Sequence, residues 1–344
     1  MPRLHKSALC LTTCFAVLAA PAALAHHGVA GVGAAALEGP GAPVESASSA
    51  VLPEGKVLVY TKLDHAKFKS VDSSDTQVNY NQFWMAGVGY GFTPWFSGYV
   101  FSPYNRKIDT AEPAGAATPK FNTSGLADMS VMGQIGFKYD KGFRLVPVNE
   151  SLDDLEDWHF TVYGGGSLPT GNPNLKNREG NIDPGKSTSF GKPDWSVGFT
   201  ATKMLSSNLT FNTEISTIRF LKYRYRADTA HPNGFDGQFG AEDRLNLGLA
   251  YRVYTNSAQK LRLDLSLETQ FLKIARDKEN GIGQEATGGK IIYLLPGIRV
   301  YKDNMSFAFG VKKVAWKRLN EDALQQGSEG KEKYRLILSA SGMF

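Results

Sequence analysis

The chain has 344 residues, of which 42% are hydrophobic and 21% are charged, and its formal net charge is +5. A surplus this small provides no basic stripe of the kind that nucleic-acid binding needs, so we expect no nucleic-acid partner. Beyond residue 25 there is no stretch of about 18 consecutive apolar residues, which excludes an ordinary transmembrane helix there.

Residues 1–25 have the pattern of a secretory signal peptide. A positively charged start precedes a short apolar stretch, and the letters ALA at 23–25 form a small-residue cleavage site. Cleavage there would remove Cys10 and Cys14, so the exported chain would carry no disulfide. Lipidation of Cys14 is the alternative, and Thr13 in front of it disfavours that interpretation.

Residues 26–55 are dominated by Gly, Ala, Pro and Ser, and we expect a flexible or extended segment without a core of its own. Such a segment either hangs in the periplasm or folds into a cavity as a plug. Its first residues, His26 and His27, could bind copper or zinc through an amine and imidazoles. No other metal-ligand pattern accompanies them, so metal handling is only an alternative function, and we expect no cofactor.

From residue 56 to residue 344 the chain consists of repeated alternating segments. The stretch LRLDLSLETQF at 261–271 places its leucines and Phe271 on one face and its charged residues on the other. This period of two is typical of strands with two different faces. We count about twelve such segments, at 57–65, 80–92, 95–104, 129–139, 158–168, 195–201, 209–217, 245–253, 261–271, 292–300, 307–311 and 332–344.

The connections between these segments alternate between short and long. Short turns are expected near 93–94, 205–208, 255–259 and 302–304, and long polar loops near 69–79, 106–127, 170–193, 223–242, 276–289 and 317–332. The connection at 140–157 is long where a short one is expected. The pattern predicts an all-β fold, a transmembrane antiparallel up-and-down β-barrel of about 12 strands with short periplasmic turns and long extracellular loops.

A closed barrel is the one spanning structure available to strands, because backbone groups cannot stay unpaired in lipid. The localisation that follows is the cell outer membrane, with outer-membrane lipid as a partner. A soluble β-sandwich is the alternative; it would turn the apolar faces inward, and its strands are usually shorter.

The polar faces predict which charged side chains line the lumen. They are Lys62, Asp64, Lys138, Glu214, Arg244, Arg252, Arg262, Asp264, Glu268, Arg299, Lys312 and Arg335. Because basic residues outnumber acidic ones in this set, one interpretation is a pore whose field attracts anions or polar-headed solutes. The other is a network of ion pairs that braces the wall, since small barrels fill their interiors with side chains.

Aromatic residues near the strand ends fit the girdles that barrels carry at the two membrane surfaces. The set comprises Trp84, Trp95, Tyr99, Trp158, Tyr251, Tyr301 and Trp316. The chain ends on Phe344 after an alternating apolar run, and this resembles the signal that the outer-membrane assembly machinery reads. We therefore expect that machinery as a partner.

Several stretches resemble the bacterial outer-membrane transporter family of the MetA-pathway of phenol degradation. They are HHG at 26–28, GYGFTPWFSGYVFSP at 89–103, GLADMSVMGQIGFKY at 125–139 and GGGSLPTGN at 164–172. The family generally has a Gly-Asp pair before the fourth strand, where this chain has Ala127-Asp128. The resemblance implies a channel or uptake barrel for small hydrophobic or aromatic compounds.

The expected function is therefore passive or facilitated diffusion of a small-molecule solute across the outer membrane. The alternatives are a barrel enzyme and an adhesive or structural surface protein. No G-x-S-x-G or H-E-x-x-H motif occurs, and we expect no catalytic residues and no enzyme activity.

Overall fold

The computed structural model describes residues 41–70, 75–147, 156–325 and 327–344. The predicted signal peptide, the pair His26 and His27, and the first part of the predicted 26–55 segment lie outside the described residues. No helix within these ranges is long and apolar enough to cross a membrane.

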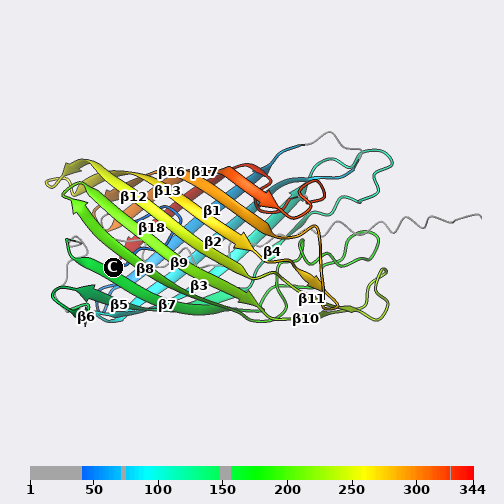
Figure 1. Cartoon of the computed structure of the whole chain (residues 1–344), viewed down its shortest axis with the longest axis horizontal. Helices are drawn as coiled ribbons and strands as arrows, with labels where there is room; N and C mark the ends of the chain where they lie inside the picture. Colours follow the sequence, from blue (N-terminus) through cyan, green and yellow to red (C-terminus); the bar gives the residue numbers. More distant parts are fainter. Residues whose placement is uncertain (1–40, 71–74, 148–155, 326) are drawn as a thin grey trace, which may run out of the picture.

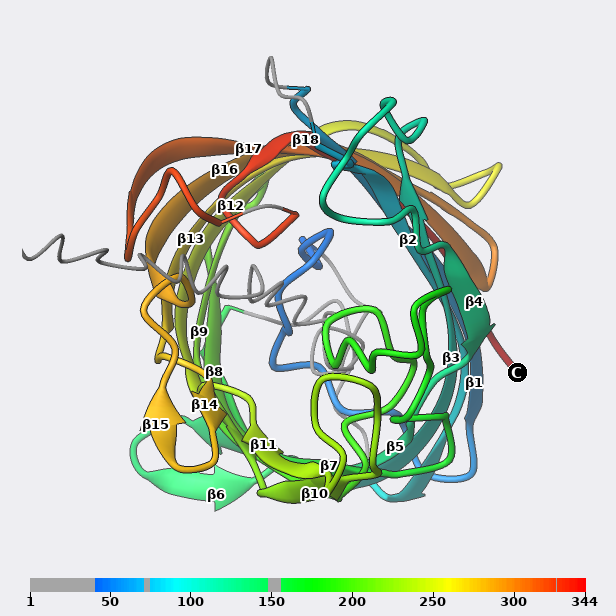
Figure 2. The ribbon, with the colours of Figure 1, turned by 90° about the vertical axis from the view of Figure 1, so that its right-hand side faces the viewer.

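Twelve strands form one closed antiparallel wall (Figures 1 and 2). In neighbour order they are β1 (Val57–Phe68), β2 (Val78–Thr93), β3 (Phe96–Asp109), β5 (Met129–Tyr139), β7 (Trp158–Leu168), β8 (Asp194–Ser206), β9 (Leu209–Phe220), β12 (Glu242–Asn256), β13 (Leu261–Ile274), β16 (Gly289–Lys302), β17 (Met305–Leu319) and β18 (Glu332–Met343). The last strand pairs with the first, in a register that begins with Leu58 opposite Met343. This closure leaves no open sheet edge, and it confirms the predicted fold class.

Six shorter strands lie outside this ring. They are β4 (Thr123–Leu126), β6 (Phe143–Leu145), β10 (Tyr223–Tyr225), β11 (Phe235–Gln238), β14 (Lys278–Glu279) and β15 (Ile282–Gly283). β4 pairs with the end of β3 and extends the wall beyond β5. β10, β11, β14 and β15 form a separate small sheet within the long connections.

The two rims of the barrel differ as predicted. Tight turns join β2 to β3, β8 to β9, β12 to β13 and β16 to β17, all at the rim where the chain ends. There the amide of Phe344 donates to the carbonyl of Val57 at 2.8 Å, which fixes the last residue beside the first strand. The long connections, with β10 and β11, gather at the opposite rim (Figure 1).

The alternation along each strand separates two environments. On β13, Leu265 and Leu267 are 47% and 51% exposed, whereas Asp264 and Glu268 are buried. The other wall strands also place apolar side chains on the outside, whereas the inside combines polar side chains with a buried apolar cluster that includes Leu58, Tyr60 and Phe101. A soluble protein shows the opposite preference. An outer surface of this kind is stable only in hydrocarbon, as in a membrane-spanning barrel.

Two predicted girdle residues, Tyr99 and Tyr301, lie on the inner face, where Tyr301 is opposite the inward Arg262 with its ring 5.1 Å from the guanidinium. Tyr99 is only 3% exposed and its ring stacks on that of Phe101, inside the barrel. The prediction was wrong because an aromatic near a strand end also serves to fill the interior, and its residue type does not distinguish the two positions. Trp84, Tyr251 and Trp316 are about half exposed, as girdle residues should be.

Candidate functional site

The twelve side chains predicted to line the lumen occupy the inward positions of their strands. Ten of them are buried, and the two exceptions, Arg252 and Arg262, are half-buried near the short-turn rim. Arg262 pairs with Asp264, and Arg252 lies opposite Asp264 in the sheet register. Whether this set selects solutes stays a prediction.

A segment of the N-terminal region crosses this interior. Residues 41–52, which we call the luminal arch, lie inside the ring of strands (Figure 2). All twelve residues are buried, and they hydrogen bond to side chains on β3, β5, β8, β9, β13, β16 and β17. The arch therefore contacts the wall on several sides.

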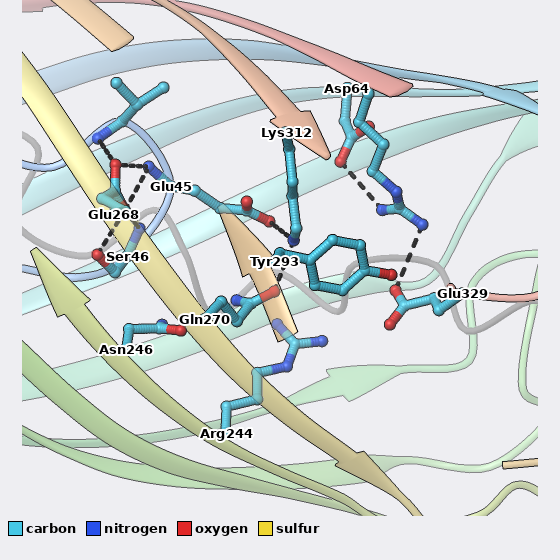
Figure 3. A network of polar contacts seen from close by, with 12 residues as sticks. Glu45, Ser46, Asp64, Arg244, Asn246, Glu268, Gln270, Tyr293, Lys312 and Glu329 are labelled. Carbon is cyan, nitrogen blue, oxygen red and sulfur yellow. Dashed lines mark hydrogen bonds and ion pairs between the residues drawn. The ribbon is translucent and has the colours of Figure 1, made fainter. Parts of the chain in front are cut away.

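The arch is anchored first by Glu268 on β13. Its carboxylate accepts hydrogen bonds from the amides of Val44 and Ser46 at 2.6 and 3.0 Å, and from Ser46 Oγ at 2.7 Å (Figure 3). The amide of Glu45 lies 3.3 Å from the same carboxylate. Several donors of the arch converge on this one buried carboxyl group, so Glu268 is a strong attachment point.

Other wall residues hold the start and the middle of the arch. Arg299 donates to the carbonyl oxygens of Ala42 and Pro43 at 3.2 and 2.5 Å. Glu214 accepts from the amide of Ala47 at 3.0 Å. Asp264 accepts from the amide of Gly41 at 3.2 Å, so four of the predicted luminal residues bind backbone of the arch, namely Glu214, Asp264, Glu268 and Arg299. Backbone partners are invisible to side-chain patterns, so the sequence could not reveal this role.

The wall is also shaped to receive the arch. Val44 is fully buried against Leu295, Ala308 and Ile337. A Cβ atom added to Gly297 would lie 2.6 Å from Val44, so only glycine leaves room for the arch at that point. Packing of this closeness indicates that the arch belongs to the folded barrel.

Glu45 is the charged residue of the arch, and it pairs with Lys312 of β17 at 2.9 Å. Lys312 also donates to Gln270 at 2.6 Å and lies 4.4 Å above the ring of Tyr293 (Figure 3). Burial opposes the charged form of Glu45, yet the field of Lys312 and Lys62 prevails and lowers its pKa to about 2. The sequence prediction missed Glu45, although it is the one charged residue between Glu38 and Glu54.

A second polar cluster lies beside this pair, towards the long-loop rim. Arg335 of β18 pairs with Asp64 and Glu329 at 3.3 and 3.4 Å, and also with Glu332. Arg244 of β12 pairs with Glu242. These contacts fit the ion-pair bracing interpretation, because Arg335 and Arg244 are both buried and both have acidic partners.

Including these partners changes the charge balance of the interior. Among the described residues, the buried acidic side chains are Glu45, Asp64, Asp109, Asp128, Asp194, Glu214, Asp228, Glu242, Asp264, Glu268, Glu329 and Glu332. The buried basic ones are Lys62, Lys107, Lys138, Lys186, Arg244, Arg299, Lys312 and Arg335. The excess is acidic, because the arch and the strand ends supply carboxylates that the alternating segments alone did not include.

A small chamber lies nearer the long-loop rim, between the wall and the connection that follows β7. Its apolar lining includes Phe83, Met85, Met132 and Phe190, and its polar lining includes Asp128. Asp128 accepts from the amides of Gly171 and Phe190 at 3.0 and 2.8 Å, which ties this connection to the wall. Asp128, the second residue of the Ala127-Asp128 pair noted in the sequence, therefore has a structural role.

The site contains no evident metal centre. Within the described part of the chain, no group of three His, Cys, Asp or Glu side chains is placed to hold a metal ion. His26 and His27 lie outside that part, so metal binding by them stays a prediction.

Solved structures resemble this barrel, although sequences do not. No family model matches the chain, and neither does any curated protein. An outer membrane channel from Pseudomonas putida F1 aligns with a TM-score of 0.66 at 12% identity, over 88% of this chain and 100% of that one. The beta domain of the Bordetella autotransporter BrkA gives 0.46 at 10% identity, over 85% and 100%. The toluene transporter TodX of Pseudomonas putida gives 0.38 at 10% identity, over 85% and 89%. The similarity to the outer membrane channel from Pseudomonas putida F1 supports the barrel fold.

Proposed function

We propose that this chain is an outer-membrane channel that passes small molecules through its lumen and is closed by the luminal arch. The observation that carries the proposal is the arch itself, whose backbone is held by Glu268, Glu214 and Arg299 inside a polar interior. The solved structure with the highest TM-score given above is described as an outer membrane channel, which agrees with this function. We expect no enzyme activity.

The lumen acts by size and charge and does no covalent chemistry. A solute entering from the long-loop side meets the chamber first, where Phe83 and Phe190 offer apolar contact and Asp128 a polar one. This lining suits small molecules with an apolar body and a polar group. It agrees with the hydrophobic or aromatic compounds that the resemblance to the MetA-pathway family implies.

Two further roles belong to the proposal. Residues 26–55 act together as the plug, with residues 41–52 as its docked part. Phe344, bound to Val57 at the short-turn rim, is the residue that the barrel assembly machinery recognises during insertion.

The test is release of the arch by the variant Glu268→Ala. Loss of the anchoring bonds should raise the open probability in planar bilayers at least about tenfold, since each 1.4 kcal/mol is a factor of ten. Glu285→Ala, an exposed residue in a long loop, is the matched control and should behave as the wild type. Deleting residues 28–55 should give the largest conductance.

The outcomes separate the two parts of the proposal. If Glu268→Ala and the deletion both leave the conductance of a folded, inserted barrel unchanged, the arch is not the plug. If none of the variants passes sugars or aromatic acids in liposome swelling, the channel function is rejected as well.

A further inference from the structure

Three cations meet side by side on the outer wall at the long-loop rim. Lys273 of β13 lies opposite Lys290 of β16, and Lys290 lies opposite Arg318 of β17. All three side chains are exposed, on the face that carries the apolar residues of the membrane band. Figure 2 shows these three strands next to one another on one side of the barrel.

This row is unfavourable for the protein alone. Residues directly opposite each other in neighbouring strands have Cβ atoms about 4.5–5.5 Å apart, and like charges there are destabilising. Within the described residues, neither Lys290 nor Arg318 forms an ion pair or a hydrogen bond through its side chain. Lys273 has one acidic neighbour, Asp243, whose carboxylate is already bonded to Arg219 at 2.8 Å.

The surface directly below the row is apolar. Phe271, Ile292 and Trp316 form the next outward row on the same three strands. They line a groove of the outer wall together with Phe199, Ile215 and Leu245, and Lys273 and Lys290 stand at its edge. A groove facing hydrocarbon suits acyl chains, and cations at its edge suit an anionic head group.

At the same rim, the outward cations of β1 and β3 have different neighbours. Lys67 of β1 lies opposite Tyr80 and Tyr334, and Arg106 of β3 lies opposite Gln82 with its guanidinium 5.8 Å from the Tyr80 ring. Each cation there has uncharged neighbours, as in an ordinary interfacial girdle. The run of three adjacent cations therefore belongs to one side of the molecule.

We propose that Lys273, Lys290 and Arg318, with the groove beneath them, bind a phosphorylated lipid of the leaflet on the long-loop side. The phosphate bridges the three cations. Arg318 supplies a planar guanidinium group, whose N–H groups can donate two parallel hydrogen bonds to phosphate oxygens. The acyl chains lie along Phe271, Ile292 and Trp316. In an outer membrane the lipid of this chemistry is a phosphorylated, multiply acylated glycolipid of the lipid A type.

The test is retention of fluorescent lipid A by the full chain in phosphatidylcholine nanodiscs. The double variant Lys290→Gln/Arg318→Gln should weaken its binding about tenfold or more, because two charge-assisted contacts are lost. The control Lys67→Gln/Arg106→Gln removes the same two residue types from β1 and β3 at the same rim and should stay within about twofold of the wild type.

Two results would overturn the proposal. One is equal loss, or no loss, of lipid A binding in the two double variants. The other is displacement of the lipid by millimolar inorganic phosphate, which would show that the cations recognise free phosphate. Heat-modifiable migration in detergent gels checks that each variant is folded before binding is measured.

Discussion

Glu45 is the side chain whose charge we expect to contribute most to closure by the arch. It is buried in the arch and paired with Lys312, which also contacts Gln270 and the ring of Tyr293. The pair is screened from solvent, so its removal should matter more than the loss of an exposed ion pair would. Lys312 would then be left buried without its carboxylate.

The pH dependence of this contact follows from the direction of the shift. The pKa of Glu45 falls from 4.5 to about 2 in the folded state, so the ionised form stabilises the docked arch. That stabilisation is fully present above pH 4.5 and is lost as the pH falls through about 2.

The difference in open probability between the wild type and Glu45→Gln should therefore be constant from about pH 8 to pH 5 and shrink below that range. Single-channel recording across this range measures it, with Glu54→Gln as a control outside the arch. A difference that disappears already between pH 7 and pH 5 would contradict the depressed pKa.

We propose the arch as the element that closes the barrel. Its contacts reach strands on several sides of the ring, yet it has no regular secondary structure of its own, so its position depends on side chains of the wall. An element held in this way can leave without unfolding the sheet, because the strand pairing does not include it.

A disulfide should lock this element in place. Ser49 Oγ lies 2.8 Å from Thr200 Oγ1 of β8, so Ser49→Cys/Thr200→Cys places two sulfurs within bonding reach. A chain beginning at His26 has no other cysteine. Oxidation should hold the conductance at the closed level even in the Glu268→Ala background, and a reductant should restore opening.

Each single-cysteine variant serves as the control for this lock and should not respond to oxidant. Channel opening that is equal before and after complete disulfide formation would mean that solutes do not pass where the arch lies. The plug proposal would then fail, whereas the barrel fold would be unaffected.

At the scale of the whole molecule, the interior contains more buried acids than bases among the described residues. The sum of these charges determines the field that a passing ion meets, and rings of charge set selectivity in channels. The basic set read from the strands alone predicts a preference for anions, whereas the larger number of buried acids among the described residues leads us to expect a preference for cations.

Deletion of residues 28–55 removes Glu45, but the other buried acids still outnumber the buried bases among the described residues, so we expect this channel to show a reversal potential of cation-selective sign in a KCl gradient. The preference should weaken as salt rises, because screening shortens the reach of the luminal charges. A reversal potential of the opposite sign would contradict this prediction and favour a pore that selects anions. Glu285→Ala in the same deletion background is the control for charge in the outer loops.

The sequence by itself determined the wall. Alternation in stretches such as 261–271 specified the strands and their two faces, because successive side chains of a strand point to opposite faces. The different lengths of the connections specified the two rims. It also placed Glu268, Arg299 and Lys312 on the inner face, since inward or outward direction is a local property.

Tertiary structure alone decided what those inner residues touch. Glu268 binds amides of residues 44–46, more than two hundred positions away in the chain, and Gly297 leaves space for Val44. The composition of residues 41–52 does not predict where this segment docks, because most of its contacts with the wall use backbone groups, which every residue has. The row of Lys273, Lys290 and Arg318 likewise exists only through strand register, which brings distant residues side by side.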